Sequence, residues 1–163
     1  MSTTTLIPVG EYLRLTGKPN REYRDGVLFP KPMATWSHGV LQGLLVAMLS
    51  RLGFRAGSEI SVRISAQIIL IPDVIATRIV QKPYPTEPVE LCCEILSPGD
   101  SLAEVFNKCE EYHDWGVPFC WVLDPAQPAA WEYHSGSQPL QVTDRLRAGG
   151  ISIDLAELFA VLD

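Results

Sequence analysis

The stretch Gln67–Ile75, which reads QIILIPDVI, decides the fold of this 163-residue chain. Its apolar residues do not alternate with polar ones, and a segment that avoids water on both faces is typical of a central strand. Two further apolar runs, Val89–Leu96 and Pro118–Leu123, predict two more buried strands. The sequence therefore predicts a sheet that is covered on both of its faces.

Two helical segments can supply that cover. From Ser37 to Leu52 the apolar residues recur every three or four positions, which is helical spacing. A second helix is expected from Ser101, which forms a capping-box pattern with Glu104, to Gly116. Helices that flank a mixed sheet indicate an α/β (α+β) fold, and the length suits one domain over residues 1–163.

Shorter elements complete the predicted fold. The Asp25-Gly26 pair predicts a tight hairpin within Glu22–Phe29, because Asp-Gly accepts the positive φ angles of such a turn. The other expected elements are a short helix at Pro8–Leu15, strands at Arg55–Ile64 and Gln67–Ala76, edge strands at Ala130–His134 and Leu140–Thr143, and a last helix from Asp154 to Leu162.

Composition favours a protein of the cytoplasm. No apolar run reaches the roughly 18 residues that a membrane span needs, and Met1–Thr5 lacks the basic and apolar parts of a secretory signal. The four cysteines lie in apolar segments without the Cys-x-x-Cys spacing of a zinc or redox site. We therefore expect a cytoplasmic protein with buried free thiols and no membrane partner.

The net charge of −6 counts against avid, non-specific binding of nucleic acid. The cations are unevenly placed, since Lys108 is the only one between Pro83 and Asp144. An early basic group either contacts a backbone phosphate or forms an ordinary solvated surface. Its members are Arg14, Lys18, Arg21, Arg24 and Lys31.

Two carboxylates interrupt the most apolar segments. Asp73 follows Ile68–Ile71, and Glu94 lies within Leu91–Leu96. An unpaired buried carboxylate costs several kcal/mol, so such a group shifts its pKa, pairs with a cation or binds a metal. On adjacent antiparallel strands the two would share one face and offer the oxygen ligands that Mg²⁺ prefers. The alternatives are a turn-forming role for Asp73 and an exposed strand edge for Glu94.

Lys108 is the third member of the candidate site. It borders the apolar stripe of its helix, one turn from Val105 and one turn from Tyr112. Its stem can therefore lie along the apolar edge and carry the ammonium back toward Glu94. The alternative is a surface ion pair with Glu104, four residues earlier on the helix. The spacing alone leaves both arrangements open.

The chain also resembles a known family. The segments that carry the resemblance are Asp25-Gly26, Pro30-Lys31-Pro32, His38, Pro72-Asp73-Val74, Glu94–Pro98, Lys108 with Tyr112, Gly116-Val117-Pro118 and Trp121–Pro125. They span about Glu11 to His134 and are similar to the Uma-type family of predicted endonucleases, which is assigned to the PD-(D/E)XK superfamily. The resemblance implies a restriction-endonuclease-like mixed β-sheet flanked by helices.

The resemblance also assigns roles to residues. In the superfamily pattern a lysine follows the acidic strand residue by two positions, and Leu96 stands there in this chain. The resemblance implies that Lys108 takes the role of that lysine and that Glu22 is the additional acid of such sites. Val27 stands where the family often has an acid just after the Asp-Gly turn. The role of His38 is open.

The residue chemistry and the resemblance together predict metal-dependent phosphodiester hydrolysis, with DNA as the expected substrate. Asp73, Glu94 and the Ile95 carbonyl would hold Mg²⁺ or Mn²⁺, which lowers the pKa of a bound water. Lys108 would orient or deprotonate that water, or stabilise the transition state.

Two other functions stay open. One is a non-catalytic nucleic-acid-binding or assembly module on the same fold, which the net charge, Leu96 and Val27 favour. The other is hydrolysis of a different phosphate ester, such as a nucleotide or RNA. Cleavage of both strands of a duplex favours a homodimer. Three tryptophans are either interface anchors or core residues, namely Trp115, Trp121 and Trp131.

Overall fold

The computed structural model describes residues 4–163. The first three residues of Met1–Thr5, the segment that lacks the parts of a secretory signal, lie outside the described residues. In chain order the elements are α1 (Val9–Tyr12), β1 (Arg21–Arg24), β2 (Val27–Pro30), α2 (Trp36–Arg51), β3 (Arg55–Ser58), β4 (Val62–Ser65), β5 (Ile68–Leu70), β6 (Val74–Thr77), β7 (Leu91–Ile95), α3 (Leu102–Trp115), β8 (Phe119–Asp124), β9 (Ala129–His134), β10 (Leu140–Val142), β11 (Arg145–Ala148), β12 (Ile151–Asp154), α4 (Leu155–Phe159) and a short 3₁₀ helix, η1 (Ala160–Leu162).

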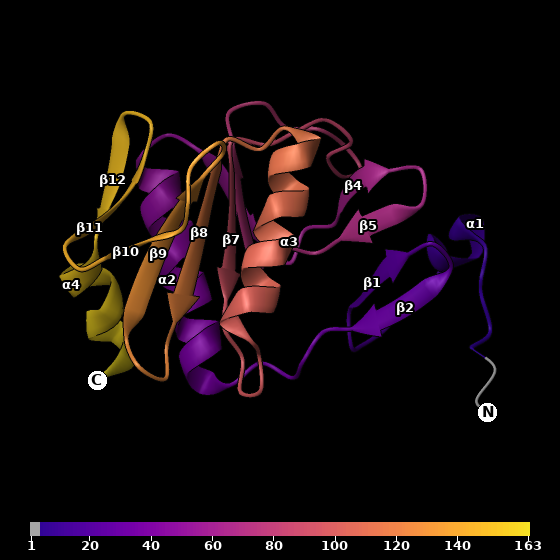
Figure 1. Cartoon of the computed structure of the whole chain (residues 1–163), viewed down its shortest axis with the longest axis horizontal. Helices are drawn as coiled ribbons and strands as arrows, with labels where there is room; N and C mark the ends of the chain where they lie inside the picture. The colour runs from indigo at the N-terminus through magenta and orange to yellow at the C-terminus, as the bar shows by residue number, and fades with distance from the viewer. Residues whose placement is uncertain (1–3) are drawn as a thin grey trace.

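The largest element is a six-stranded mixed sheet in the order β10-β9-β8-β7-β6-β3. Strands β7 and β8 are parallel and are connected through α3, whereas the other neighbours are antiparallel. Helix α2 covers one face and α3 the other (Figure 1). This is the mixed sheet flanked by helices that the sequence predicts.

Strand β7 is buried along its whole length and divides the interior into two cores. Leu91, Cys93 and Ile95 pack in the core on the α2 side, together with leucines of that helix. Cys92 packs on the α3 side with Cys109 and Tyr112. Because side chains alternate along a strand, Glu94 shares the α3 side with Cys92.

A smaller four-stranded sheet, in the order β2-β1-β5-β4, lies beside the larger one (Figure 1). Its existence corrects the prediction of two long strands at Arg55–Ile64 and Gln67–Ala76. Each segment is divided between the two sheets, because β3 and β6 belong to the larger sheet and β4 and β5 to the smaller one. A continuous apolar run shows that a chain is buried, but it does not show where the chain changes sheets.

The two crossings between the sheets are hydrogen-bonded to each other. One contains Pro72, which has no N–H to continue a strand ladder. The other contains Glu59, a non-glycine residue with a positive φ of 56°. The Glu59 N–H donates to the Asp73 carbonyl at 3.2 Å. Asp73 therefore lies at the junction of the two sheets.

The local signals for turns and helix caps are confirmed. Asp25 and Gly26 both have positive φ, 47° and 90°, in the turn between β1 and β2. Ser101 accepts the N–H of Glu104, and Asp154 accepts the N–H of Glu157, at the first turns of α3 and α4.

Two predictions about the C-terminal half were wrong or incomplete. Strand β9 is an internal strand, because β10 pairs along its outer side. The hairpin formed by β11 and β12 was not predicted, although Gly149-Gly150 separates its two strands.

Burial settles the states of the cysteines and of one tryptophan. All four cysteines are buried free thiols, as predicted. Trp121 is fully buried in the core, which excludes it as an interface anchor. Trp115 and Trp131 are half-buried against the core on the α3 side. None of the helices within residues 4–163 has both the length and the apolar character required to cross a membrane.

Candidate active site

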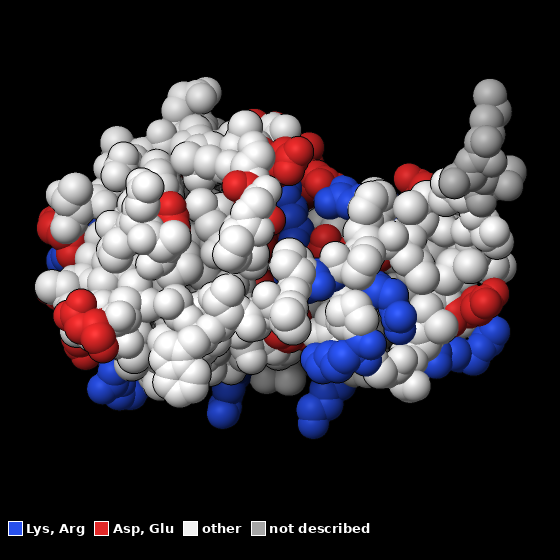
Figure 2. Space-filling model, turned by 90° about the horizontal axis from the view of Figure 1, so that it is seen from below, with Lys and Arg blue, Asp and Glu red and all other residues white. Residues whose placement is uncertain are grey.

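A pocket of about 210 Å³ lies where the two sheets meet α3. Figure 2 shows a hollow in which acidic and basic side chains face each other. Six acidic side chains and two lysines line the pocket, an excess of four negative charges when all are ionised. The charged and ionisable lining residues are Glu22, Lys31, His38, Glu59, Asp73, Glu94, Asp100, Glu104 and Lys108.

The register of β6 and β7 brings Asp73 and Glu94 together. Val74 pairs with Cys93 in the antiparallel ladder, so Asp73, one residue earlier, stands opposite Glu94. Opposed residues of antiparallel strands have side chains on the same face. Both side chains are buried, with 4% and 9% exposed. The turn-forming and edge-strand alternatives therefore do not describe these two residues.

Lys108 reaches into the pocket from α3. Its Nζ lies 3.0 Å from Glu94 Oε1 and 2.6 Å from Glu22 Oε1. Its side chain is only 16% exposed, and the structure of residues 4–163 contains no ion pair between it and Glu104. The buried arrangement is thus the one that forms. The distances bring Glu22 of β1, on the smaller sheet, into the same site as Glu94 of β7.

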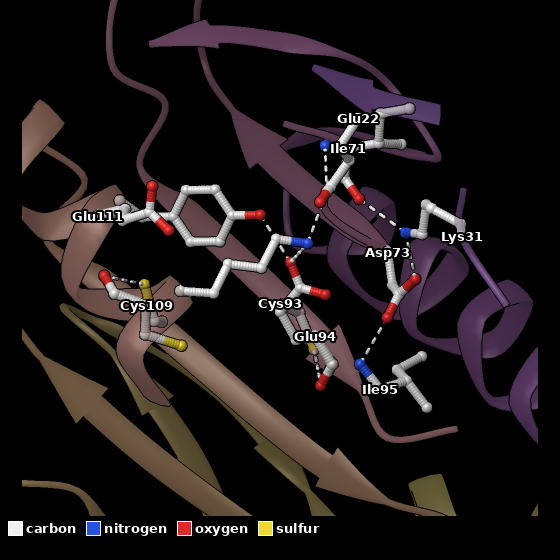
Figure 3. A network of polar contacts seen from close by, with 12 residues as sticks. Glu22, Lys31, Ile71, Asp73, Cys93, Glu94, Ile95, Cys109 and Glu111 are labelled. Carbon is white, nitrogen blue, oxygen red and sulfur yellow. Dashed lines mark hydrogen bonds and ion pairs between the residues drawn. The ribbon is translucent and has the colours of Figure 1, made fainter. Parts of the chain in front are cut away.

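Two further contacts orient the carboxylates of this site. Tyr112, one turn after Lys108 on α3, donates its hydroxyl to Glu94 Oε1 at 2.6 Å. Glu22 Oε1 accepts the N–H of Ile71 at 2.7 Å. The other oxygen of Glu94, Oε2, has no hydrogen-bond partner among residues 4–163. Figure 3 shows the Glu94 carboxylate beside the Asp73 carboxylate.

Three residues that the sequence analysis did not assign to the site also belong to it. Lys31 Nζ lies 2.7 Å from Asp73 Oδ1. Glu59 Oε1 lies 3.5 Å from the same ammonium. His38 Nε2 lies 3.4 Å from Asp73 Oδ2. The sequence signals for Lys31 were the resemblance and its place in the early basic group. For His38 the signal was the resemblance alone, and Glu59 gave none.

The early basic group divides in the structure. Lys31 lies in the pocket, and Arg24 pairs with Glu111 of α3. Arg14 and Lys18 are exposed. The group is therefore not a single patch.

The two central carboxylates have opposite pKa shifts. Burial alone raises the pKa of Asp73, but the contact with His38 and the charge of Lys31 outweigh it and hold this pKa well below its usual range. Burial dominates at Glu94 and raises its pKa from 4.5 to about 7, although Lys108 opposes the shift. The site thus contains one fully ionised carboxylate and one that titrates near neutral pH.

Lys108 stays protonated in this environment. Burial alone lowers the pKa of its ammonium, but the charges of Glu94 and Glu22 outweigh burial and raise it above the ordinary value. An ammonium with a raised pKa has no free lone pair at neutral pH. Lys108 is therefore suited to stabilise negative charge rather than to accept a proton.

The pocket fits a divalent cation. Its acidic excess, the unpartnered Glu94 Oε2 and the ionised Asp73 provide hard oxygen donors of the kind that Mg²⁺ and Mn²⁺ prefer. Residues 4–163 contain no ready-made cluster of three His, Cys, Asp or Glu ligands. Water would have to complete the shell, which is usual for Mg²⁺.

Comparisons with known proteins identify a family and a similar fold. The Uma2 family model, described as "Putative restriction endonuclease", matches residues 9–160. None of the curated proteins matches the chain. The structure is similar to the crystal structure of a putative nuclease belonging to DUF820 from Anabaena variabilis ATCC 29413, with a TM-score of 0.81 and 20% sequence identity over 96% of this chain and 99% of that chain.

A second structural similarity is more limited. The cryo-EM structure of a DrdV–DNA complex has a TM-score of 0.45 and 19% identity over 74% of this chain, and the match covers 11% of that chain. At these identities the structural similarity to the Anabaena protein shows the fold alone.

Proposed function

The chain belongs to the Uma2 family of restriction-endonuclease-type proteins, and from this premise we propose that it is a metal-dependent endonuclease that hydrolyses phosphodiester bonds in DNA. The observation that carries the proposal is the pocket in which Asp73, Glu94 and Lys108 meet. A buried pair of carboxylates beside a protonated lysine is a set of groups suited to phosphate-ester hydrolysis.

In this proposal Asp73, Glu94 and the Ile95 carbonyl hold Mg²⁺ or Mn²⁺. When bound, the ion supplies a water of lowered pKa and neutralises charge on the scissile phosphate. Lys108 stabilises the negative charge that develops in the transition state, because its ammonium stays protonated between Glu22 and Glu94. Glu22 positions Lys108 and binds the backbone of Ile71.

The charge around the pocket supports a nucleic-acid substrate. Figure 2 shows further Lys and Arg side chains around the hollow on the same face. Cations at this rim can contact the phosphate backbone on either side of the scissile bond. The net charge of −6 counts against non-specific binding over the whole surface, so such contacts would depend on local groups of cations.

Single alanine variants of Asp73, Glu94 and Lys108 test the proposal. Each should lower cleavage of plasmid DNA in Mg²⁺ or Mn²⁺ by at least about 100-fold, while far-UV circular dichroism shows a folded protein. Arg51→Ala is the matched control, because Arg51 is 65% exposed and pairs with Glu157 away from the pocket. EDTA should stop cleavage by the wild type.

Two results would reject this function. Wild-type cleavage rates in all three alanine variants would exclude the pocket as the active site. Absence of Mn²⁺ binding in calorimetry, or binding that Asp73→Asn leaves unchanged, would instead indicate a non-catalytic nucleic-acid-binding module.

We also propose that the form active on duplex DNA is a homodimer. Two antiparallel strands present two scissile bonds, and a two-fold dimer places one pocket at each. Size-exclusion chromatography with light scattering, run without DNA, should give a mass near 36 kDa, which is twice the 18.0 kDa of the chain. A monomer that cuts both strands at the same rate would contradict the dimer.

A further inference from the structure

The ammonium of Lys31 occupies a position surrounded by oxygen atoms. It lies 2.6 Å from the Ile71 carbonyl, 2.7 Å from Asp73 Oδ1 and 3.5 Å from Glu59 Oε1. One carbonyl and two carboxylates are the donor types that bind divalent cations in proteins. Figure 3 shows Lys31 pointing at Ile71 and Asp73 from the side opposite Glu94.

The backbone around Lys31 fixes the side chain in this place. The residue stands between Pro30 and Pro32, whose rings restrict the φ angles on both sides. Its own N–H donates to the Asn20 carbonyl at 2.8 Å. The Asn20 side chain in turn donates to Glu59 Oε2 at 2.8 Å, so one residue positions both the cation and one of its acidic partners.

The ammonium of Lys31 lies between two carboxylates, 2.7 Å from Asp73 Oδ1 and 3.5 Å from Glu59 Oε1. The side chain is only 13% exposed, so this charge is poorly screened by water. A divalent ion that approached the same oxygens would meet a fixed positive charge among them.

Resting on the proposed function, we propose that Lys31 fills the position of a second cation, so that the pocket binds one divalent ion and not two. The single ion is held by Asp73 and Glu94. The ammonium of Lys31 neutralises the Glu59 carboxylate and Oδ1 of Asp73. Without Lys31, these oxygens would be free to bind a second ion. Lys31 is thus a positioning residue that sets the number of metal ions.

Counting bound Mn²⁺ tests this inference without any measurement of cleavage. Calorimetry and electron paramagnetic resonance should give one ion for the wild type and two for Lys31→Ala, because this change frees the oxygens of Ile71, Asp73 and Glu59. The double variant Lys31→Ala/Glu59→Gln should return to one ion. Lys31→Arg, which keeps the charge, and Lys18→Ala, which removes an exposed lysine, should each bind one.

The possible outcomes separate this inference from the proposed function. Two ions in the wild type, or one ion in a folded Lys31→Ala variant, would overturn the inference and leave a metal site intact. No ion in the wild type would contradict the proposed function itself. If Lys31→Ala does not fold, a wild-type crystal soaked in Mn²⁺ decides. One anomalous peak at Glu94 supports the inference, and a peak at Glu59 overturns it.

Discussion

The carboxylate of Asp73 accepts the N–H of Ile95 at 2.7 Å, just beyond the last pair of the β6–β7 ladder, Val74 with Cys93. The side chain of Asp73 thus supplies the acceptor for Ile95 at the point where Pro72, which has no N–H, cannot donate to the continuing ladder. Asp73 therefore has two roles, since it ends the ladder and also carries charge into the pocket. Substitutions at this position should separate the two roles.

Asp73→Ala should destabilise the fold more than Asp73→Asn. Alanine leaves the buried Ile95 N–H without an acceptor, which costs about 1–3 kcal/mol, whereas asparagine can keep that bond through its carbonyl. Both variants should lose Mn²⁺ binding, because both remove the charge. Urea denaturation measures the first effect and calorimetry the second. Equal stabilities of the two variants would show that the bond to Ile95 contributes nothing.

The stability of the metal-free protein should fall as pH rises through neutrality. The folded-state pKa of Glu94 is raised from 4.5 to about 7, so between these values the folded protein holds a proton that the unfolded chain has released. This contribution is complete below about pH 4.5 and is lost as pH rises through about 7. The loss is on the order of a few kcal/mol.

Glu94→Gln should remove most of that pH dependence, because glutamine does not titrate. Thermal unfolding of metal-free protein between pH 5 and pH 8 compares the two curves. Glu157→Gln is the control, since this carboxylate is 60% exposed and should leave the wild-type slope unchanged. Parallel curves for wild type and Glu94→Gln would contradict the raised pKa.

Tyr112→Phe should weaken Mn²⁺ binding about 5-fold to 10-fold, which corresponds to the roughly 1 kcal/mol of one hydrogen bond. The hydroxyl supports the ionised form of Glu94, and burial raises the pKa of Tyr112 well above its ordinary value, so it remains a donor. Tyr133→Phe is the matched control. The Tyr133 hydroxyl donates to Glu110 of α3 at 2.9 Å, outside the pocket. Its loss should therefore leave the Mn²⁺ affinity unchanged.

Native protein should not react with a thiol reagent such as DTNB at pH 8. All four cysteines are buried, and burial raises the pKa of Cys92, Cys93 and Cys120 well above the ordinary value. Only the thiolate reacts, so both access and ionisation are blocked. Four thiols should titrate after denaturation in urea, and rapid reaction of any thiol in native protein would contradict the described core.

The sequence predicts the acidic part of the site because buried charge is a local anomaly. Asp73 and Glu94 interrupt apolar segments, and the stem of Lys108 borders an apolar stripe. Lys31 stands between two prolines and Glu59 follows Gly57-Ser58, in turn-like segments where a charged residue is not an anomaly. Their place beside Asp73 depends on where the chain leaves one sheet for the other. Hydrophobic periodicity does not contain that information, since apolar residues stand on both sides of the change of sheet, in Ile68–Ile71 and in Val74–Ala76.

The dependence of the pocket on both sheets has a consequence for biosynthesis. Glu22 comes from the smaller sheet and Glu94 from the larger one, and the ammonium of Lys108 bridges them. A nascent chain that has formed only one of the two sheets cannot yet bring Glu22, Glu94 and Lys108 together. Such an intermediate would expose acids without their counter-charge. The full set of charged groups in the pocket would therefore be assembled only when both sheets are in place.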